Sequence, residues 1–218
     1  MSIRGVIFDF DGTLVDTLPD IADAVNEGLK TYGLPPQPAA QVRAWIGEGM
    51  PTLCRRAVQD AANVPIDEMA AKVTSFYREH RLEHVVLYPG VADLLDALTE
   101  RGIHMAILSN KPHEHMGPMV EALLGRWSFL AVEGYHDEER RKPDPRIALA
   151  IVAKMNLEPR QVLMVGDSAT DVKTGINAGL LPVGVPWGYR DRQELIDNGA
   201  RHIVEQPDEI FHFLDFSN

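Results

Sequence analysis

The chain has 218 residues, which is long enough for one full core domain and a smaller appended one. Its 32 acidic residues against 21 lysines and arginines give a net charge of -11, which argues against a nucleic-acid surface because phosphate backbones are bound by clustered cations. The chain has a single cysteine, so no intrachain disulfide is expected. It shows no signal-peptide pattern and no apolar stretch of the ~20 residues that a membrane span needs. These features predict a cytoplasmic protein without a membrane partner.

Five short apolar runs predict strands of a parallel sheet. They are rich in Val, Ile, Leu and Met, as expected for strands covered on both faces, and they span residues 4–8, 104–108, 129–132, 161–165 and 181–185. Amphipathic helical patterns lie between strands, at 91–101 and 147–155. This alternation favours an α/β fold with a doubly wound parallel sheet.

One region interrupts the alternation with helical patterns alone. Helices are expected at 20–32, 39–45, 51–61 and 66–81, separated by turns rich in Gly and Pro. So long a helical stretch between two strands indicates a subdomain inserted into the α/β core. We therefore expect a core domain made of residues 1–16 and 86–218 and a helical cap domain made of residues 17–85.

The first strand runs directly into a pair of aspartates, Asp9 and Asp11. In a doubly wound sheet, ligands bind beyond the carboxyl ends of the strands, and residues two apart on a strand face the same side. One carboxylate can act as a nucleophile towards phosphorus, and its neighbour can act as general acid and then as general base. Gly12 allows a sharp turn and a close approach to a ligand. A pair of solvated turn aspartates is the alternative reading.

Two further strand ends carry groups suited to an anionic substrate. Ser109, after the second strand, offers a hydroxyl and nearby backbone N–H groups to phosphate oxygens, although simple helix capping is the alternative. Lys142, in a loop stiffened by prolines, could offset the charge of a reacting phosphoryl group. Arg141 precedes it and competes for the same role.

Asp167 and Asp171 follow the fourth strand. Beside Asp9 they would form an oxygen-rich site for a hard cation, with Mg²⁺ as the natural candidate. Capping of the next helix by Asp167 or Ser168 is the alternative, and it is compatible with metal binding.

The stretches FDFDGTLVDT, ILSNKP, RRKPDP and VGDSATDV together resemble the haloacid dehalogenase superfamily of phosphohydrolases. The resemblance implies a Rossmann-like core with a mobile helical cap inserted after the first strand. It also implies a Mg²⁺-dependent phosphomonoester hydrolase that passes through an aspartyl phosphate on its nucleophile. It implies that Asp9 is the nucleophile and Asp11 the general acid/base, and that Lys142 contacts the phosphate and Asp9. The implied phosphate-binding residues are Gly12, Thr13, Ser109 and Asn110. The implied metal-site residues are Asp9, Asp11, Asp167 and Asp171.

Within the superfamily, the cap segment WIGEGMPTLCRRAV resembles that of bacterial phosphoglycolate phosphatases. This implies a small phosphate ester as substrate, with 2-phosphoglycolate the leading candidate. We separately expect a monomer or homodimer. Gly47, Gly49 and Arg56 are the cap positions expected to contact it, with a solvated helix face as the alternative for Arg56.

Several other functions compete with this one. A sugar-phosphate mutase would return the phosphate to its substrate, and a dehalogenase is rejected because Asp11 is present. A phosphonate hydrolase would need a cap lysine, for which only Lys30 and Lys72 are candidates. From other classes come a phospho-acceptor signalling domain, which would need no cap, and a silent binding protein, which would not need the whole set of charged residues. His113 and His115 are expected to face solvent.

Overall fold

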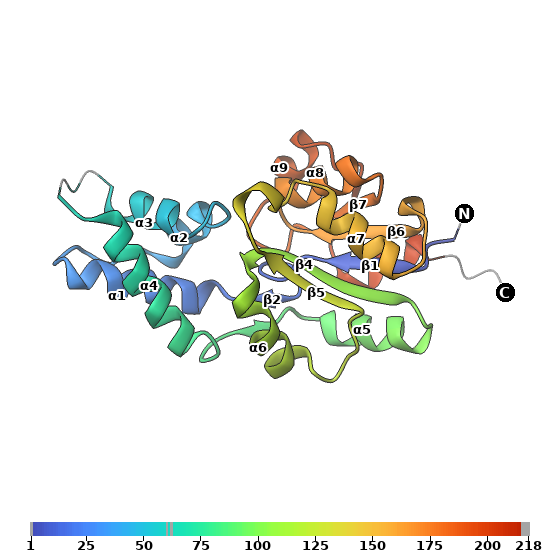
Figure 1. Ribbon diagram of the computed structural model, residues 1–218, viewed down its shortest axis with the longest axis horizontal. Coiled ribbons are helices and arrows are strands. Elements are labelled where there is room, and N and C mark those ends of the chain that lie inside the picture. Colours follow the sequence, from blue (N-terminus) through green and yellow to red (C-terminus); the bar gives the residue numbers. More distant parts are fainter. Residues whose placement is uncertain (1, 60, 62, 215–218) are drawn as a thin grey trace. The chain divides into compact units, whose positions relative to one another are not determined.

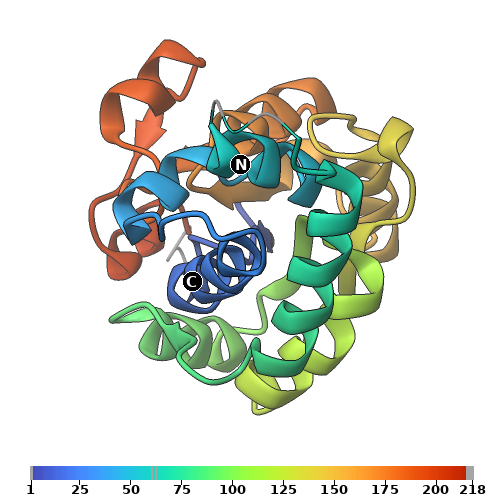
Figure 2. The ribbon, with the colours of Figure 1, turned by 90° about the vertical axis from the view of Figure 1, so that its left-hand side faces the viewer.

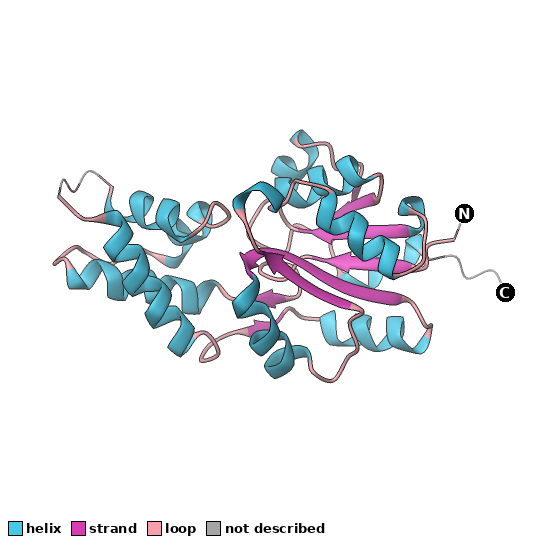
Figure 3. Ribbon diagram, in the orientation of Figure 1, coloured by secondary structure: helices cyan, strands magenta, loops and turns pink. Residues whose placement is uncertain are grey.

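The computed structural model describes residues 2–59, 61 and 63–214 and confirms the α/β fold class. Its main sheet has six parallel strands in the order β5-β4-β1-β6-β7-β8 (Figures 1 and 3). These strands are β1 Gly5–Phe8, β4 His104–Pro112, β5 Ala131–Tyr135, β6 Val162–Gly166, β7 Leu181–Gly184 and β8 His202–Ile203. Every residue of β1 and of β6 is buried, because helices cover both faces of the sheet centre.

The helices of the core lie on the two faces of this sheet. Right-handed crossover connections place α5 and α6 on one face and α7, α8 and α9 on the other (Figure 3). Their bounds are α5 Val91–Glu100, α6 His113–Leu124, α7 Arg146–Lys154, α8 Ala169–Ala178 and α9 Arg192–Asp197. Three 3₁₀ helices complete the core: Glu138–Arg140, Pro159–Gln161 and Pro207–Phe213.

The chain divides into two compact units. The core unit comprises Met1–Val15 and Leu87–Asn218, and the helical unit comprises Asp16–Val86. The two chain crossings coincide with two short strands, β2 Val15–Asp16 and β3 Val86–Leu87, which form a separate two-stranded sheet. In the described part of 17–85, all regular elements are helices: α1 Leu18–Thr31, α2 Ala39–Trp45, α3 Met50–Val58 and α4 Ile66–His80.

The helical unit has its own apolar core, in which α1 packs against α4 (Figure 2). Gly28 of α1 lets the two helices approach closely, since a Cβ there would lie 2.4 Å from Cγ2 of Val73. Val25, Leu29 and Met69 are fully buried in the same apolar core. Among the described residues, no helix is both long and apolar enough to cross a membrane.

Some predicted boundaries were wrong, each for a local reason. The strand expected at 104–108 continues to Pro112, because pairing with β5 resumes there after a bulge that begins at Leu108. The strand expected at 129–132 begins two residues later, at Ala131. The helix expected at 51–61 ends at Val58, and residue 60 of that prediction lies outside the described residues.

Helix α6 and the short elements α9 and β8 were not predicted. Helix α6 contains Gly117 and Pro118, which weaken a helical pattern, and β8 has only two residues. The helix also corrects the expectation for His115, which is only 5% exposed because it lies on the buried side of α6.

Candidate active site

The register of the central strands brings three loops of the core together. Phe8 of β1 pairs with Ile107 of β4 and with Val165 of β6, so the residues that follow these three positions lie at one edge of the sheet. The N–H of Asp9 continues the ladder and donates to the Val165 carbonyl at 2.8 Å. This alignment explains why side chains about 150 residues apart in sequence share one site.

Three aspartates are buried together at this edge. Asp9, Asp167 and Asp171 are 7%, 2% and 1% exposed, and one carboxylate oxygen from each lies within 4.8 Å of the others. All three are positions at which the sequence predicted a metal site. Carboxylate oxygens in this number and spacing suit a hard divalent cation.

Lys142 lies between two of these aspartates. Its Nζ is 2.8 Å from Oδ1 of Asp9 and 2.5 Å from Oδ1 of Asp171, and its side chain is 1% exposed. Arg141, the rival, instead forms an ion pair with Glu138 at 2.7 Å and lies over the Tyr135 ring. The structure therefore places Lys142, and not Arg141, among the aspartates.

Asn110 holds the Lys142 backbone from both sides. Its Nδ2 donates to the Lys142 carbonyl at 3.0 Å, and its Oδ1 accepts from the Lys142 N–H at 2.8 Å. This pair of bonds links the β4 bulge to the loop before α7. Asn110 thus positions Lys142 in this structure, and its predicted contact with phosphate stays a prediction.

The site is short of positive charge. Burial raises the pKa of Asp9 well above its usual range, and the charges of Asp171 and Asp167 add to this effect while Lys142 opposes it. Burial and the neighbouring Asp171 also raise the pKa of Asp167 to about 7. Burial alone would lower the pKa of Lys142, but the two carboxylates that it contacts raise it instead. One ammonium does not balance three buried carboxylates, so the residues present fit a bound cation.

This imbalance predicts how a cation should affect stability at different pH values. The pKa of Asp167 is raised by folding, so without a cation the free energy of unfolding should fall as the pH rises from about 4 to about 7. A divalent cation would stabilise the ionised carboxylates and oppose this fall. We therefore expect Mg²⁺ to raise the melting temperature more at about pH 8 than at about pH 5, measured by thermal unfolding with Mg²⁺ and with EDTA. An equal rise at both pH values would contradict the expectation.

Asp167 is held in place by the turn after β1 and by a loop after β7. Its Oδ2 accepts from the Tyr189 N–H at 2.6 Å, and its Oδ1 is 3.5 Å from the Thr13 hydroxyl. Gly12 has a φ of +84°, and a Cβ there would lie 2.4 Å from Asp167 Oδ2. A Cβ at Gly188 would lie 2.0 Å from the Gly12 carbonyl oxygen, so both glycines are required for this close packing. Thr13 itself is 1% exposed and contacts Asp167.

Asp171 has a structural task as well as its place in the cluster. Ser168 is the N-cap of α8, and both its N–H and its hydroxyl donate to Oδ2 of Asp171, at 3.0 and 2.5 Å. Since Oδ1 of Asp171 already accepts from Lys142, both oxygens are engaged. Helix capping and membership of the acidic cluster therefore coexist at this turn, as the sequence allowed.

Two parts of the site were missed in the sequence. Lys111 is buried, and its Nζ contacts both oxygens of Asp11 at 2.8 and 2.9 Å. The segment Trp187–Tyr189 closes over Asp167, and Trp187 donates to the Thr13 carbonyl at 3.1 Å. Trp187–Tyr189 follows β7, so the rule that ligands bind beyond carboxyl ends could have found this segment. Lys111 instead lies inside β4, and its partner Asp11 is 100 positions away. Ser109 is 3% exposed and its Oγ accepts from the Lys111 N–H at 3.2 Å.

The predicted cap residues lie in the helical unit. Arg56 donates to the Trp45 carbonyl at 3.2 Å and forms an ion pair with Glu48 at 2.6 Å. Gly47 and Gly49, on either side of Glu48, have φ values of +123° and +87°, so this loop depends on glycine. Arg56 is thus a loop-fixing residue within its unit, and substrate contact by these three residues stays a prediction.

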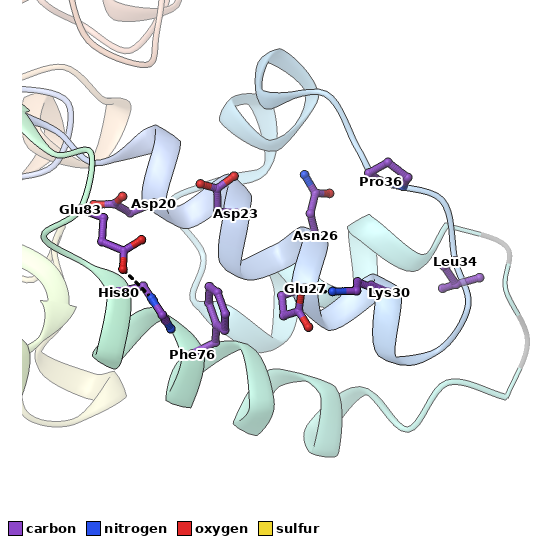
Figure 4. Close-up of a pocket in the computed structure, with 10 residues that line it drawn as sticks. All are labelled: Asp20, Asp23, Asn26, Glu27, Lys30, Leu34, Pro36, Phe76, His80 and Glu83. Atoms are coloured by element: carbon purple, nitrogen blue, oxygen red, sulfur yellow. Dashed lines mark hydrogen bonds and ion pairs between the residues drawn. The ribbon is translucent and has the colours of Figure 1, made fainter.

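A separate cavity of about 440 Å³ lies within the helical unit (Figure 4). Residues of α1 and of the α4 region line most of it: Asp20, Asp23, Asn26, Glu27, Lys30, Leu34, Pro36, Phe76, His80 and Glu83. It contains none of the site residues predicted from the sequence. Its mixed acidic and basic lining does not provide the cationic cradle that a phosphate group requires.

Comparison with known proteins agrees with this arrangement. The haloacid dehalogenase-like hydrolase family matches residues 6–185. A phosphoglycolate phosphatase of Pseudomonas putida is 37% identical over 192 residues, which cover 85% of this chain and 70% of that protein. A phosphoglycolate phosphatase of Escherichia coli strain K12 is 34% identical over 234 aligned positions, covering 98% of this chain and 90% of the relative.

A solved structure shares the fold over almost the whole chain. It is a predicted phosphoglycolate phosphatase from Haemophilus somnus, with a TM-score of 0.86 and 29% identity over 97% of this chain and 98% of that one. The family match includes the loops that carry Asp9, Lys142 and Asp167. On this match and on the relatives' identity, the chain belongs to the haloacid dehalogenase-like hydrolases.

Proposed function

We propose that this protein is a divalent-cation-dependent phosphomonoesterase that acts on a small phosphorylated metabolite, with 2-phosphoglycolate as its substrate. The observation that carries the proposal is the buried cluster in which Lys142 contacts Asp9 and Asp171 beside Asp167. The names of the relatives support the choice of substrate.

Asp9 is the nucleophile in this proposal. Its Oδ1 accepts from Lys142 at 2.8 Å and from the Phe10 N–H at 2.7 Å, so we assign the attack on phosphorus to Oδ2. A new O–P bond forms on Asp9 while the ester O–P bond breaks. Lys142, already directed at Asp9, then donates to the oxygens of the transferred phosphoryl group.

Asp11 is the general acid and then the general base in this proposal. It donates a proton to the departing ester oxygen, then accepts one from the water that attacks the aspartyl phosphate and releases inorganic phosphate. In this structure both Asp11 oxygens contact Lys111, so Asp11 must turn from that lysine to reach the leaving group. Lys111 is a positioning residue for Asp11 in this scheme.

The cation would be held by Asp9, Asp167 and the Asp11 backbone carbonyl, with Asp171 supporting the site because both of its oxygens are engaged. When bound, Mg²⁺ would neutralise charge on the phosphate and fix its orientation. Gly12 and the backbone around Ser109 would receive the phosphate oxygens.

A substrate panel tests the proposal directly. We expect phosphate release from 2-phosphoglycolate in Mg²⁺, abolished by EDTA, and much slower release from sugar phosphates and nucleoside monophosphates. A different best ester would retain the chemistry and overturn the choice of substrate. Isomerisation of a sugar phosphate without phosphate release would indicate a mutase, and no reaction with any ester would overturn the proposed function.

A further inference from the structure

A second cluster of metal-binding groups lies in the core unit, apart from the three aspartates. It consists of His113, the first residue of α6, Glu133 of β5 and His136, just after β5. One ligand atom from each residue lies within 4.8 Å of the others. The proposed phosphatase reaction uses none of these residues.

The spacing of the donor atoms corresponds to a shared ion rather than to direct hydrogen bonds. Oε2 of Glu133 is 3.7 Å from Nδ1 of His113 and 3.5 Å from Nε2 of His136. Hydrogen bonds between such groups are usually about 2.7–3.2 Å long. Two ligands of a tetrahedral Zn²⁺ ion with bonds of about 2.1 Å lie roughly 3.4 Å apart, which is close to both distances.

Neighbouring groups orient this set of donors. Lys154 forms an ion pair with Oε1 of Glu133 at 3.2 Å, so the other oxygen, Oε2, faces the imidazoles. The two imidazole rings lie 4.1 Å apart, at an interplanar angle of 32°. The Gly134 N–H donates to Nδ1 of His113 at 3.2 Å, which favours the tautomer with its lone pair on this nitrogen. A metal would replace that long hydrogen bond.

From this geometry we propose that His113, Glu133 and His136 form a binding site for a divalent transition metal of the Zn²⁺ class. Two imidazole nitrogens and one carboxylate oxygen are the donor set that Zn²⁺ accepts, with water at a fourth position. The half-exposed side chains of His113 and His136 leave an entry path from solvent. The aspartate cluster, which has no imidazole, suits a hard cation instead, so the two sites differ in the metal that they select.

The site adjoins the bulge that carries Ser109 and Lys111. His113 follows this bulge directly, and a Cβ at Gly134 would lie 2.4 Å from the Lys111 carbonyl oxygen, which shows how closely the two backbones approach. A metal shared by His113, Glu133 and His136 therefore joins the start of α6 to the end of β5, beside the bulge that carries Ser109.

Calorimetric titration with Zn²⁺ in excess Mg²⁺ tests the proposal, with Co²⁺ absorbance as a second readout of tetrahedral coordination. We expect one Zn²⁺ site in the wild-type protein. The Zn²⁺ affinity of His136→Ala and of Glu133→Gln should be lower than that of the wild type by roughly tenfold or more. His212→Ala, which removes an exposed histidine outside the cluster, is the matched control and should bind as the wild type does. Melting temperatures close to that of the wild type establish that the variants fold.

Three outcomes would overturn the site. They are no stoichiometric Zn²⁺ binding by the wild-type protein, unchanged affinity in both cluster variants, and an equal loss in the His212→Ala control. The test is independent of phosphatase activity, because it measures metal binding and coordination geometry only.

Discussion

Asp9→Asn is expected to abolish turnover while leaving the protein folded. The substitution removes the group that attacks phosphorus but keeps an oxygen that can accept from Lys142 and from the Phe10 N–H. Loss of a nucleophile typically lowers kcat by several orders of magnitude, and we expect a fall on the order of 10⁴-fold or more. Steady-state kinetics on the best ester of the substrate panel would measure it.

Stability should respond to Asp9→Asn in the opposite direction from activity. Asp9 is one of three buried carboxylates whose repulsion raises its own pKa, so a neutral amide relieves part of that repulsion. Without a divalent cation, the melting temperature of the variant should equal or exceed that of the wild type. Near-normal turnover would contradict the proposed role of Asp9. A variant that fails to fold would contradict the expectation that a neutral amide relieves repulsion among the three carboxylates. Asp11→Asn should be nearly as damaging to turnover.

Lys142→Met is expected to damage both stability and turnover. The ammonium lies between Asp9 and Asp171 with its side chain 1% exposed, so its removal leaves two buried carboxylates facing each other. Removing one partner of a buried ion pair costs roughly 3–5 kcal/mol of unfolding free energy. Urea unfolding in EDTA would show this as a lower transition midpoint, and kcat on the same ester should fall as well.

Arg141→Met is the matched control for that experiment. Arg141 is the adjacent cation in the same loop, and its partner Glu138 is exposed. The ion pair with an exposed partner contributes little, and Met keeps apolar contact with the Tyr135 ring although the Arg141 side chain is only 15% exposed. We therefore expect a smaller loss of unfolding free energy than in Lys142→Met and near-normal kcat. If Arg141→Met proved the more damaging substitution, the assignment of Lys142 to the site would be wrong.

The strand-end rule accounts for what could be anticipated at the site. Short apolar runs mark the central strands because these strands are buried on both faces, and polar residues must follow where the strands leave the core. Asp9, Asp167 and Asp171 were therefore predicted together, and the structure brings them together. The helical insert could be predicted in the same way, from apolar spacing that changes period.

Other assignments depend on contacts that no local pattern contains. The sequence left Lys142 and Arg141 as rivals, and only the ion pair of the Lys142 ammonium with Asp9 shows which residue is directed at Asp9. Asn110, 32 positions earlier, holds the Lys142 backbone through two hydrogen bonds. Lys111 received no role from the sequence, because its partner Asp11 lies 100 positions away.

By itself, the sequence determined the α/β class, the helical insert and the candidate acidic cluster, because periodicity and residue type at strand ends are local properties. The resemblance to the family was carried by its motifs. The tertiary structure alone decided the partners of each charge: Asp171 with Lys142 and Ser168, Asp11 with Lys111, and Glu133 with His113 and His136. The physical reason is that an ion pair or a metal site requires atoms a few ångströms apart. Strand register and loop packing set those distances, and residues far apart in the sequence determine both.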